Sequence, residues 1–245
     1  MLKKLEGLFV KPYYRCLICR HAVKSKAYPF CHRCGHLYSR IISHNCYDCG
    51  KPPRECSCID VEPCLGIYRL FDYKGFTAMR VLYTLKKRAS VWDYEYVTSK
   101  LTERIYATSG QGMSFDCVCY VPREKKSIDR YGYDQSKRLA MLLAQSLGCE
   151  WKPLIAHTGV EGEQKRLSRE FRGVAAKTRF KINESALVEG KLPYKRVLLA
   201  DDIITTGATM SECARILKSH GVKHIFGIAI AHTPSIKNKR FYNGK

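Results

Sequence analysis

Four pairs of closely spaced cysteines near the amino terminus constrain the fold of this chain more than any other feature. They are Cys16 with Cys19, Cys31 with Cys34, Cys46 with Cys49, and Cys56 with Cys58. A C-x-x-C pair places two sulfurs on one edge of a tetrahedron, and Zn²⁺ takes four such ligands in structural sites. The eight cysteines therefore predict two structural zinc ions, with protein ligands at every position and none left open for catalysis.

The distribution of these pairs between the two ions stays open at this point. The first two pairs can form one site and the last two the other, or the two sites can be cross-braced. Cys56-Ser57-Cys58 departs from the C-x-x-C spacing. Another residue can therefore replace one ligand of the second site, and the candidates are Cys64, His36 and His44. The opening residues lack a long apolar segment, which predicts no signal peptide, a cytoplasmic location and no disulfide framework.

After Cys64, short apolar strands alternate with helical patterns. Strands are predicted at 65–75, 115–122, 196–204 and 224–233. Helices are predicted at about 76–86, 92–107, 137–148 and 208–221. The basic segment 123–136 predicts a loop, in which Asp134 or Ser136 can cap the next helix, and Gly148 can end that helix. This alternation predicts an α/β fold with a parallel sheet covered by helices, preceded by a small zinc-binding domain.

The chain is strongly basic, with 43 Lys and Arg against 22 Asp and Glu and a formal net charge of +21. Such a field attracts polyanions, namely nucleic acid, anionic lipid or phosphorylated small molecules. A basic protein kept soluble by its charge is the alternative. Aromatic residues interleave with the basic ones in the head and suit base stacking on single-stranded DNA, although they can instead pack on the zinc sites. They are Tyr13, Tyr14, Tyr28, Phe30, Tyr38 and Tyr47. No apolar run is long enough to span a bilayer, which predicts no membrane insertion.

An apolar run stops at two adjacent carboxylates in the stretch "VLLADDIITTGATM". Ligands of open α/β sheets bind at the carboxyl ends of the strands, and the same rule brings the loop after Pro122 to this edge. Asp201 and Asp202 can each accept a hydrogen bond from one hydroxyl of a vicinal diol. Gly207 allows close approach to the backbone, and the free N–H groups of a helix amino terminus suit a phosphate monoester. The stretch therefore predicts a site for a ribose 5-phosphate.

The stretch "VLLADDIITTGAT" resembles the phosphoribosyl-pyrophosphate signature of type I phosphoribosyltransferases. Together with the cysteine-rich head, "DCVCYVP", "GYDQSKRLA" and "EQKRLSREFR" in that order, it makes the whole chain similar to the ComF (ComFC/GntX-like) family. The resemblance implies a cysteine-rich zinc-binding domain at 1–64 and a type I phosphoribosyltransferase-like domain at 65–245. Proteins of that family are linked to natural competence, the handling of incoming transforming DNA.

Carried over residue by residue, the resemblance implies several groups of site residues. Asp201 and Asp202 would bind the ribose. The cradle of the 5-phosphate would be Thr205, Thr206, Gly207, Ala208 and Thr209. The residues facing the pyrophosphate, usually with Mg²⁺ bridging, would be Arg123, Lys125 and Lys126. Arg166 and Arg172 would reach the substrate or DNA. Tyr131 to Gln135 reads "YGYDQ" where relatives typically show "RGFNQ", so phosphoribosyl binding is implied more strongly than turnover, and no catalytic residue is assigned.

Three functions follow from the sequence and its resemblance. The first is a competence-associated protein that binds single-stranded DNA and phosphoribosyl pyrophosphate, or a similar ribose phosphate, during natural transformation. The alternative is an active phosphoribosyltransferase that transfers phosphoribose to an unidentified nucleobase or amine acceptor. A regulator that keeps the pocket only for sensing is a third reading. The resemblance also implies a helicase-like partner in the DNA-uptake system.

Overall fold

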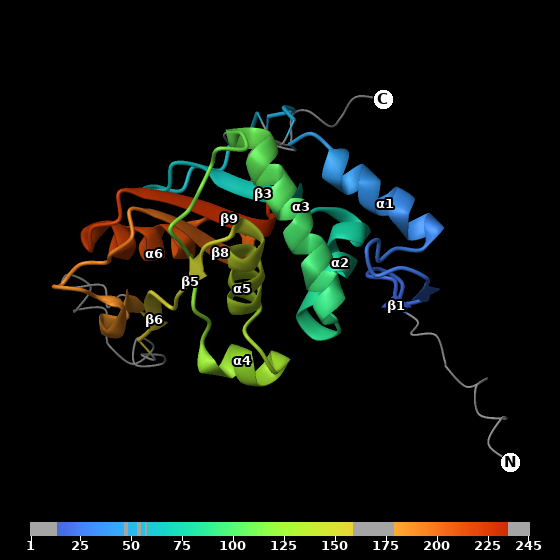
Figure 1. The fold of residues 1–245 in the computed structure, drawn as a ribbon. Helices are drawn as coiled ribbons and strands as arrows, with labels where there is room; N and C mark the ends of the chain where they lie inside the picture. The colour runs from blue at the N-terminus through green and yellow to red at the C-terminus, as the bar shows by residue number, and fades with distance from the viewer. Residues whose placement is uncertain (1–13, 47–48, 53–54, 57, 159–178, 235–245) are drawn as a thin grey trace, which may run out of the picture.

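A five-stranded parallel sheet forms the centre of the protein (Figure 1). The computed structural model describes residues 14–46, 49–52, 55–56, 58–158 and 179–234. The strands run in the order β3 (Ile67–Asp72), β9 (His224–His232), β8 (Arg196–Ile204), β4 (Cys117–Tyr120) and β5 (Glu150–Trp151). Every neighbouring pair in this sheet is parallel. The predicted α/β fold class is therefore confirmed.

Alternate residues of β8 face two different hydrophobic clusters. Leu198 and Ala200 pack with residues of α3 (Val91–Ser109) and α5 (Gln135–Leu147). Val197 and Leu199 pack with residues of α6 (Ala208–Ser219). Helices thus cover both faces of the sheet, which explains why its strands appear in the sequence as nearly continuous apolar runs.

Local signals set the ends of the helices. The carboxylate of Asp134 caps α5 by accepting a hydrogen bond from Lys137 N at 3.0 Å, and Gly148 follows the helix with a φ of 68°. Both positions agree with the predicted helix ends. Helix α2 (Gly75–Lys87) follows β3. Among the helices of the described residues, none has the length and apolar character that crossing a membrane requires.

The prediction of a loop throughout 123–136 is wrong, because Lys125–Tyr131 form a short helix, α4. It ends where Gly132 adopts a left-handed φ of 77° and donates its N–H to the carbonyl of Ile128. Lys125 and Lys126 lie in the first turn of this helix and are exposed. A short, mostly polar helix lacks the hydrophobic period by which helices are recognised in a sequence.

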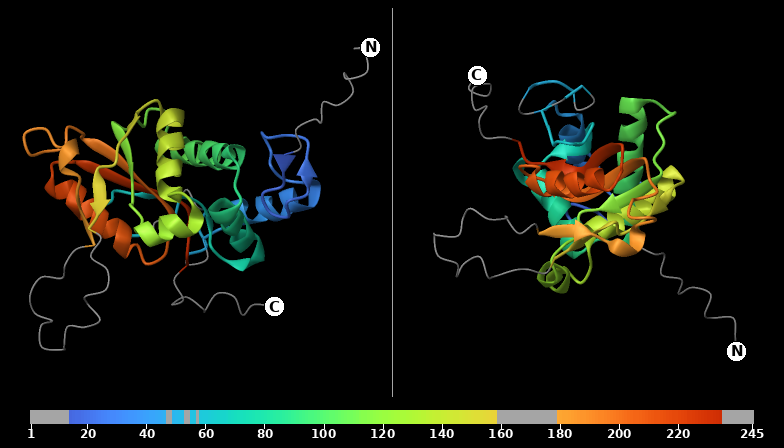
Figure 2. Two further views of the ribbon diagram at one scale, coloured as in Figure 1. Left: turned by 90° about the horizontal axis from the view of Figure 1, so that it is seen from below. Right: turned by 90° about the vertical axis from the view of Figure 1, so that its left-hand side faces the viewer.

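The head, defined as residues 1–64, has more regular structure than its loop-rich composition predicts. Strands β1 (Tyr14–Arg15) and β2 (Ala22–Val23) pair antiparallel, and α1 (His32–Ser43) follows them. Figure 2 shows β1 and α1 at the end of the molecule away from α6. Phe30 and Tyr38 stack with their ring centroids 4.3 Å apart and pack against Tyr96 of α3.

The same contacts revise the role of the head aromatics. Phe30 and Tyr38 are buried, so they do not offer their rings to DNA, whereas Tyr28 is exposed. Tyr13 and Tyr47 lie outside the described residues. Because buried residues of the head and of α3 belong to one hydrophobic cluster, the two parts share a core. The division into 1–64 and 65–245 remains a prediction.

A separate antiparallel pair, β6 (Ile155–His157) and β7 (Phe180–Ile182), lies beside α6. A 3₁₀ helix, Glu184–Ala186, follows β7. Residues 159–178, between these two strands, are outside the described part of the chain. The predicted contacts of Arg166 and Arg172 therefore stay predictions.

Candidate functional site

The eight paired cysteines form two groups in which every sulfur lies within 4.8 Å of the others. The first group is Cys16, Cys19, Cys31 and Cys34, and the second is Cys46, Cys49, Cys56 and Cys58. The pairs are thus used sequentially and are not cross-braced. Within the described residues, neither group includes Cys64, His36 or His44. Each group of four sulfurs at this spacing can hold one metal ion, which is consistent with zinc.

The first cysteine group is partly enclosed. The sulfurs of Cys19 and Cys31 lie 3.7 Å apart, and His21 Nδ1 lies 3.3 Å from the Cys19 sulfur. Burial opposes the charged form of Cys16, yet backbone N–H groups, chiefly those of Cys19 and Cys31, donate to its sulfur and lower its pKa to about 7. A thiolate is the form that binds metal, so this backbone arrangement favours metal binding.

The second cysteine group touches the sheet through Arg69 of β3. Arg69 is 3% exposed, and its Nε donates to Asp72 Oδ1 at 2.8 Å. Its Nη2 lies 3.6 Å from the Cys56 sulfur. A buried guanidinium held by a carboxylate can orient the sulfur of a candidate metal ligand.

Asp201 and Asp202 lie near the carboxyl end of β8, and side chains from three other elements converge on them. Asp202 is buried and forms ion pairs with Arg123, which follows β4, and with Lys86 of α2, whose Nζ is 3.0 Å from Oδ2. Ser136 of α5 donates its hydroxyl to Asp201 Oδ1 at 2.9 Å. The Arg123 contact confirms that the loop after Pro122 and the Asp201–Thr209 turn meet at one edge of the sheet.

The two carboxylates differ in their surroundings. Burial and the adjacent charge of Asp202 raise the pKa of Asp201 to about 8, against the smaller opposing effects of Arg123 and of hydrogen bonds from Asp202 N and Ser136. Asp202 has two cationic partners, whereas Asp201 accepts hydrogen bonds from the Ser136 hydroxyl and from Asp202 N. Near neutral pH, Asp201 is therefore partly protonated in the ligand-free protein.

The turn that follows β8 needs glycine for two reasons. Gly207 has a φ of +78°, a left-handed conformation that side chains disfavour. A Cβ at this position would also lie 2.6 Å from Cγ2 of Val61, in the last part of the head. Beside it, Ser211 of α6 donates its hydroxyl to the carbonyl of Glu62. The head thus packs directly on the turn, so the backbone geometry of the turn depends on the head.

The remaining turn residues are accessible to a ligand. Thr205 and Thr206 are exposed, as is Ala208, the first residue of α6. Ala208 N lies 3.4 Å from Thr206 Oγ1. Hydroxyl and N–H donors therefore gather where the positive end of the α6 dipole emerges. The roles of Asp201, Asp202 and residues 205–209 as ribose-phosphate ligands, and of Arg123, Lys125 and Lys126 at the pyrophosphate, stay predictions.

Three neighbouring residues were missed by sequence reasoning. Arg179 Nη2 lies 3.2 Å from Thr209 Oγ1 and 3.3 Å from Glu212 Oε2, which puts a further cation beside the turn. Lys86 and Ser136 reach the acids from α2 and α5. All three come from segments remote from the acids in sequence. Ser136 lies in the stretch "GYDQSKRLA", but that stretch predicts no contact with Asp201, and Lys86 and Arg179 belong to no motif.

Comparisons with known proteins agree with this geometry. The phosphoribosyl transferase domain family matches residues 136–243, which include both acids, the turn and α6. Competence protein F of Haemophilus influenzae is 25% identical over 240 residues, covering 89% of this chain and 97% of that protein. DNA utilization protein YhgH of Salmonella typhimurium is 26% identical over 214 residues, covering 84% of this chain and 85% of that protein. Together with the phosphoribosyl transferase match, these two relatives support an assignment to the ComF family.

The ComF assignment accounts for the order of the parts. The phosphoribosyl transferase match begins at Ser136, the donor to Asp201, and leaves the cysteine-rich head outside it. The longer alignments to Competence protein F and to YhgH cover most of the chain. The chain thus combines a phosphoribosyl transferase domain with a cysteine-rich head whose two sulfur groups can hold metal ions.

Proposed function

We propose that this ComF-family chain handles single-stranded DNA during natural transformation and binds phosphoribosyl pyrophosphate, or a similar ribose phosphate, at the turn between β8 and α6. One observation supports the ribose-phosphate site. Asp201 and Asp202 are followed within a few residues by Gly207 and the amino terminus of α6, inside the phosphoribosyl transferase match. The net charge of +21 and the names of the relatives support the DNA half. We further propose that it acts in the cytoplasm beside a helicase-like competence protein.

The residues around the turn suggest how the ligand is held. The ribose hydroxyls donate to the carboxylates of Asp201 and Asp202. The hydroxyls of the turn and the first N–H groups of α6 donate to the 5-phosphate. Arg123 and Lys86, which already lie beside Asp202, supply positive charge for a pyrophosphate.

Mg²⁺ bound together with phosphoribosyl pyrophosphate fits the donors at this edge of the sheet. Mg²⁺ prefers oxygen ligands and is usually bound through one or two carboxylates plus the phosphates of a substrate. Burial, and after it the charge of Asp202, raises the pKa of Asp201, and a divalent cation beside the two acids would favour the ionised form. When bound, Mg²⁺ neutralises charge on the pyrophosphate, and Asp201 is the acid that we expect to become ionised beside it.

An active phosphoribosyltransferase is the second candidate, and the match to the phosphoribosyl transferase domain favours it. In that reaction the C1–oxygen bond to pyrophosphate breaks and a bond forms from C1 to a nitrogen of a nucleobase or amine acceptor. Arg123 and Lys86 would stabilise the departing pyrophosphate. Release of pyrophosphate separates this candidate from a protein that only binds.

The test compares ligand binding by the wild type and by Asp201→Asn and Asp202→Asn. Titration calorimetry with phosphoribosyl pyrophosphate and Mg²⁺ should give roughly 10- to 100-fold weaker binding for both variants, because each loses a hydrogen bond to a charged acceptor. Glu184→Gln, an exposed acid in the 3₁₀ helix, removes the same charge elsewhere and should bind normally. Equal affinity in all four proteins would refute the site.

Two further measurements complete this test. Fluorescence anisotropy with a labelled oligothymidine should detect DNA binding that weakens steeply as the salt concentration rises. A wild type that binds no single-stranded DNA would refute the DNA half. Pyrophosphate release that requires both Asp201 and Asp202 and a nucleobase would favour the transferase.

A further inference from the structure

Helix α2 has an apolar side that nothing in the described residues covers. Phe76, Met79 and Tyr83 are 67%, 49% and 39% exposed, and their spacing of three and four residues puts them on one side of the helix. The opposite side, with Val81, Leu82 and Leu85 among others, is buried in the protein core. A helix that packs against the core through one apolar side needs no second apolar side for folding, so we expect the exposed side of α2 to bind a partner.

Cations are interleaved with these exposed rings. Lys87 Nζ lies 5.3 Å from the ring centroid of Tyr83, and the guanidinium carbons of Arg80 and Arg88 each lie 5.9 Å from it. Arg80 also lies 6.0 Å from the ring centroid of Phe76. From Lys74 to Arg88 the sequence has five basic residues and no acidic one. We call Phe76, Met79, Arg80, Tyr83, Lys87 and Arg88 the outer face of α2.

The outer face runs between the head and the acids of β8. Arg80 Nη2 donates to the carbonyl of Ile18 in the head at 3.3 Å. Near the other end of the helix, Lys86 pairs with Asp202. Figure 1 shows α2 between the head and the central sheet. A linear ligand lying along this helix would therefore extend from the zinc-binding region toward the ribose-phosphate site.

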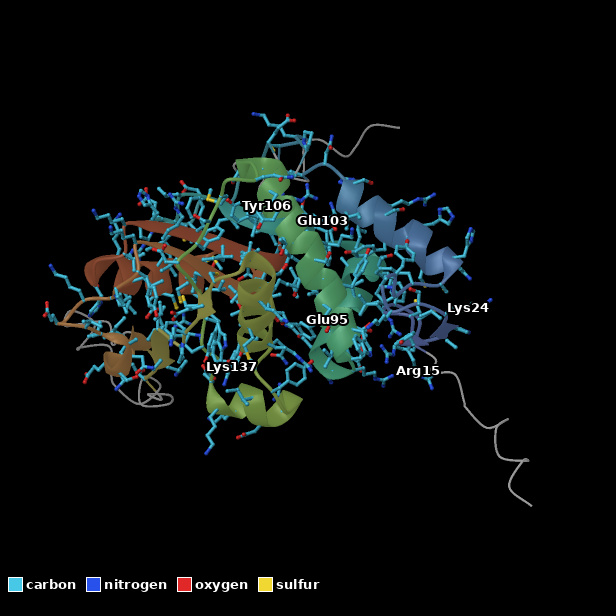
Figure 3. All side chains as sticks on the ribbon, viewed as in Figure 1. Arg15, Lys24, Glu95, Glu103, Tyr106 and Lys137 are labelled. Atoms are coloured by element: carbon cyan, nitrogen blue, oxygen red, sulfur yellow. The ribbon has the colours of Figure 1, made fainter. Side chains whose placement is uncertain are left out.

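The cavity between α3 and the head suits a polyanion less well. It has a volume of about 650 Å³ and is lined by aromatic residues, by Lys26 and Lys100, and also by Glu95 and Glu103, so its charges balance. Figure 3 labels both glutamates on α3. These carboxylates offset the charge of the two lysines, whereas the outer face of α2 carries positive charge only.

We propose that the outer face of α2 is the surface that binds a single DNA strand, with Phe76 and Tyr83 stacking on bases and Arg80, Lys87 and Arg88 contacting phosphates. The assignment rests on the DNA half of the proposed function. Seven residues of helix separate the two rings by about 10 Å, whereas stacked bases rise about 3.4 Å, so each ring meets a different base. Stacking on aromatic rings with phosphates in a basic groove is how proteins bind single strands without sequence preference.

The experiment measures binding of a labelled 20-nucleotide oligothymidine by anisotropy at several salt concentrations. Phe76→Ser/Tyr83→Ser should weaken binding about tenfold or more and leave the salt dependence unchanged, because it removes stacking but no charge. Lys87→Gln/Arg88→Gln should reduce the slope of log K against log salt by about 1.4, since each phosphate contact on a single strand contributes about 0.7.

A matched control uses two exposed lysines near the amino end of β9, at the other edge of the sheet. Lys191→Gln/Lys223→Gln removes the same charge and should keep both the affinity and the salt slope of the wild type. All these variants should bind phosphoribosyl pyrophosphate as the wild type does, because none of the substituted residues contacts Asp201, Asp202 or the turn. Asp201→Asn should bind phosphoribosyl pyrophosphate more weakly and should retain the DNA affinity of the wild type.

Several outcomes would overturn the assignment. If the wild type binds the oligothymidine and both α2 variants bind it equally well, α2 is not the DNA surface, although the proposed function stands. If Phe76→Ser/Tyr83→Ser instead dissociates an oligomer without weakening DNA binding, the outer face contacts a second copy of the chain. If the wild type itself binds no DNA, the proposed function fails and this inference fails with it.

Discussion

Arg69 joins the second cysteine group to the sheet, with Nη2 3.6 Å from the Cys56 sulfur and Nε 2.8 Å from Asp72 Oδ1. Through this contact, a residue of β3 reaches a sulfur of the group that can hold a metal ion in the head. The two cysteine groups therefore differ in their surroundings, because the cysteines of the first group come from the turn between β1 and β2 and from the start of α1.

Arg69→Met should weaken metal binding at one site of the two. Loss of a residue that orients a ligand typically lowers metal affinity about 10- to 100-fold. Competition with a chromophoric zinc chelator should therefore resolve one weakened zinc per chain and one unchanged. Arg69→Lys retains the charge, so the zinc affinity of its weakened site should lie between those of the wild type and Arg69→Met. Equal weakening of both sites would mean that the variant has unfolded the head generally.

Cys34→Ser should remove one zinc of the two, because it takes a ligand from the first cysteine group. Its effect on stability should extend beyond the head, since Cys16 and Cys34 belong to the cluster that includes α3 and α5. Cys213→Ser is the matched control, because Cys213 is a buried cysteine of α6 outside both groups. Metal analysis should find about two zinc in Cys213→Ser and about one in Cys34→Ser. Two zinc in both variants would contradict the ligand assignment.

Asp201→Asn should stabilise the ligand-free protein at alkaline pH. The pKa of Asp201 is about 8 in the folded chain, well above its unfolded value near 4, so the folded state binds more protons between these two values. The contribution of Asp201 to stability therefore falls as the pH rises from about 4 to 8, whereas Asn has no charge to desolvate and keeps the acceptor for Ser136 and for the N–H of Asp202. Urea unfolding should give a gain on the order of 2 kcal/mol at pH 8 and almost none at pH 4.

Asp202→Asn provides the contrast for this measurement. Removing its charge leaves Arg123 and Lys86 beside a neutral amide, so the variant should be less stable than the wild type at pH 8. Equal effects of the two substitutions would show that the acids do not differ in the way the structure indicates.

Gly207→Ala should cost more free energy of unfolding than Gly190→Ala. Both glycines have a positive φ, 78° and 77°, and each alanine therefore incurs strain of about 1–2 kcal/mol. Only at Gly207 does the new Cβ meet another side chain, that of Val61, whereas Gly190 has nothing within 4 Å. The difference in urea unfolding should be about 1–3 kcal/mol, and Val61→Ala should recover part of it in the double variant. A Gly207→Ala protein as stable as Gly190→Ala would contradict the contact.

Four strands of the sheet, the cysteine pairs and the turn could be predicted because each has a local signature, whereas the two-residue strand β5 was not predicted. Buried strands such as β8 are continuous apolar runs, and metal ligands follow fixed spacings. The contacts around the acids have no such signature. Ser136 and Asp201 are 65 residues apart, and only the completed sheet brings them to one edge. Helices α1 and α4 were missed for another reason: one lies in a segment dominated by cysteine spacing, and the other has too few apolar residues to show a period.

The hydrogen bond from Ser211 to Glu62 spans 149 residues of sequence. During synthesis the cysteine-rich head leaves the ribosome long before α6 exists. The ligands of both metal sites all lie between Cys16 and Cys58, so a nascent chain can capture both ions while the surface that completes the head is still untranslated. We therefore expect metal to bind first and the head to dock on the turn last, so that chains synthesised without zinc should reach the native fold in lower yield.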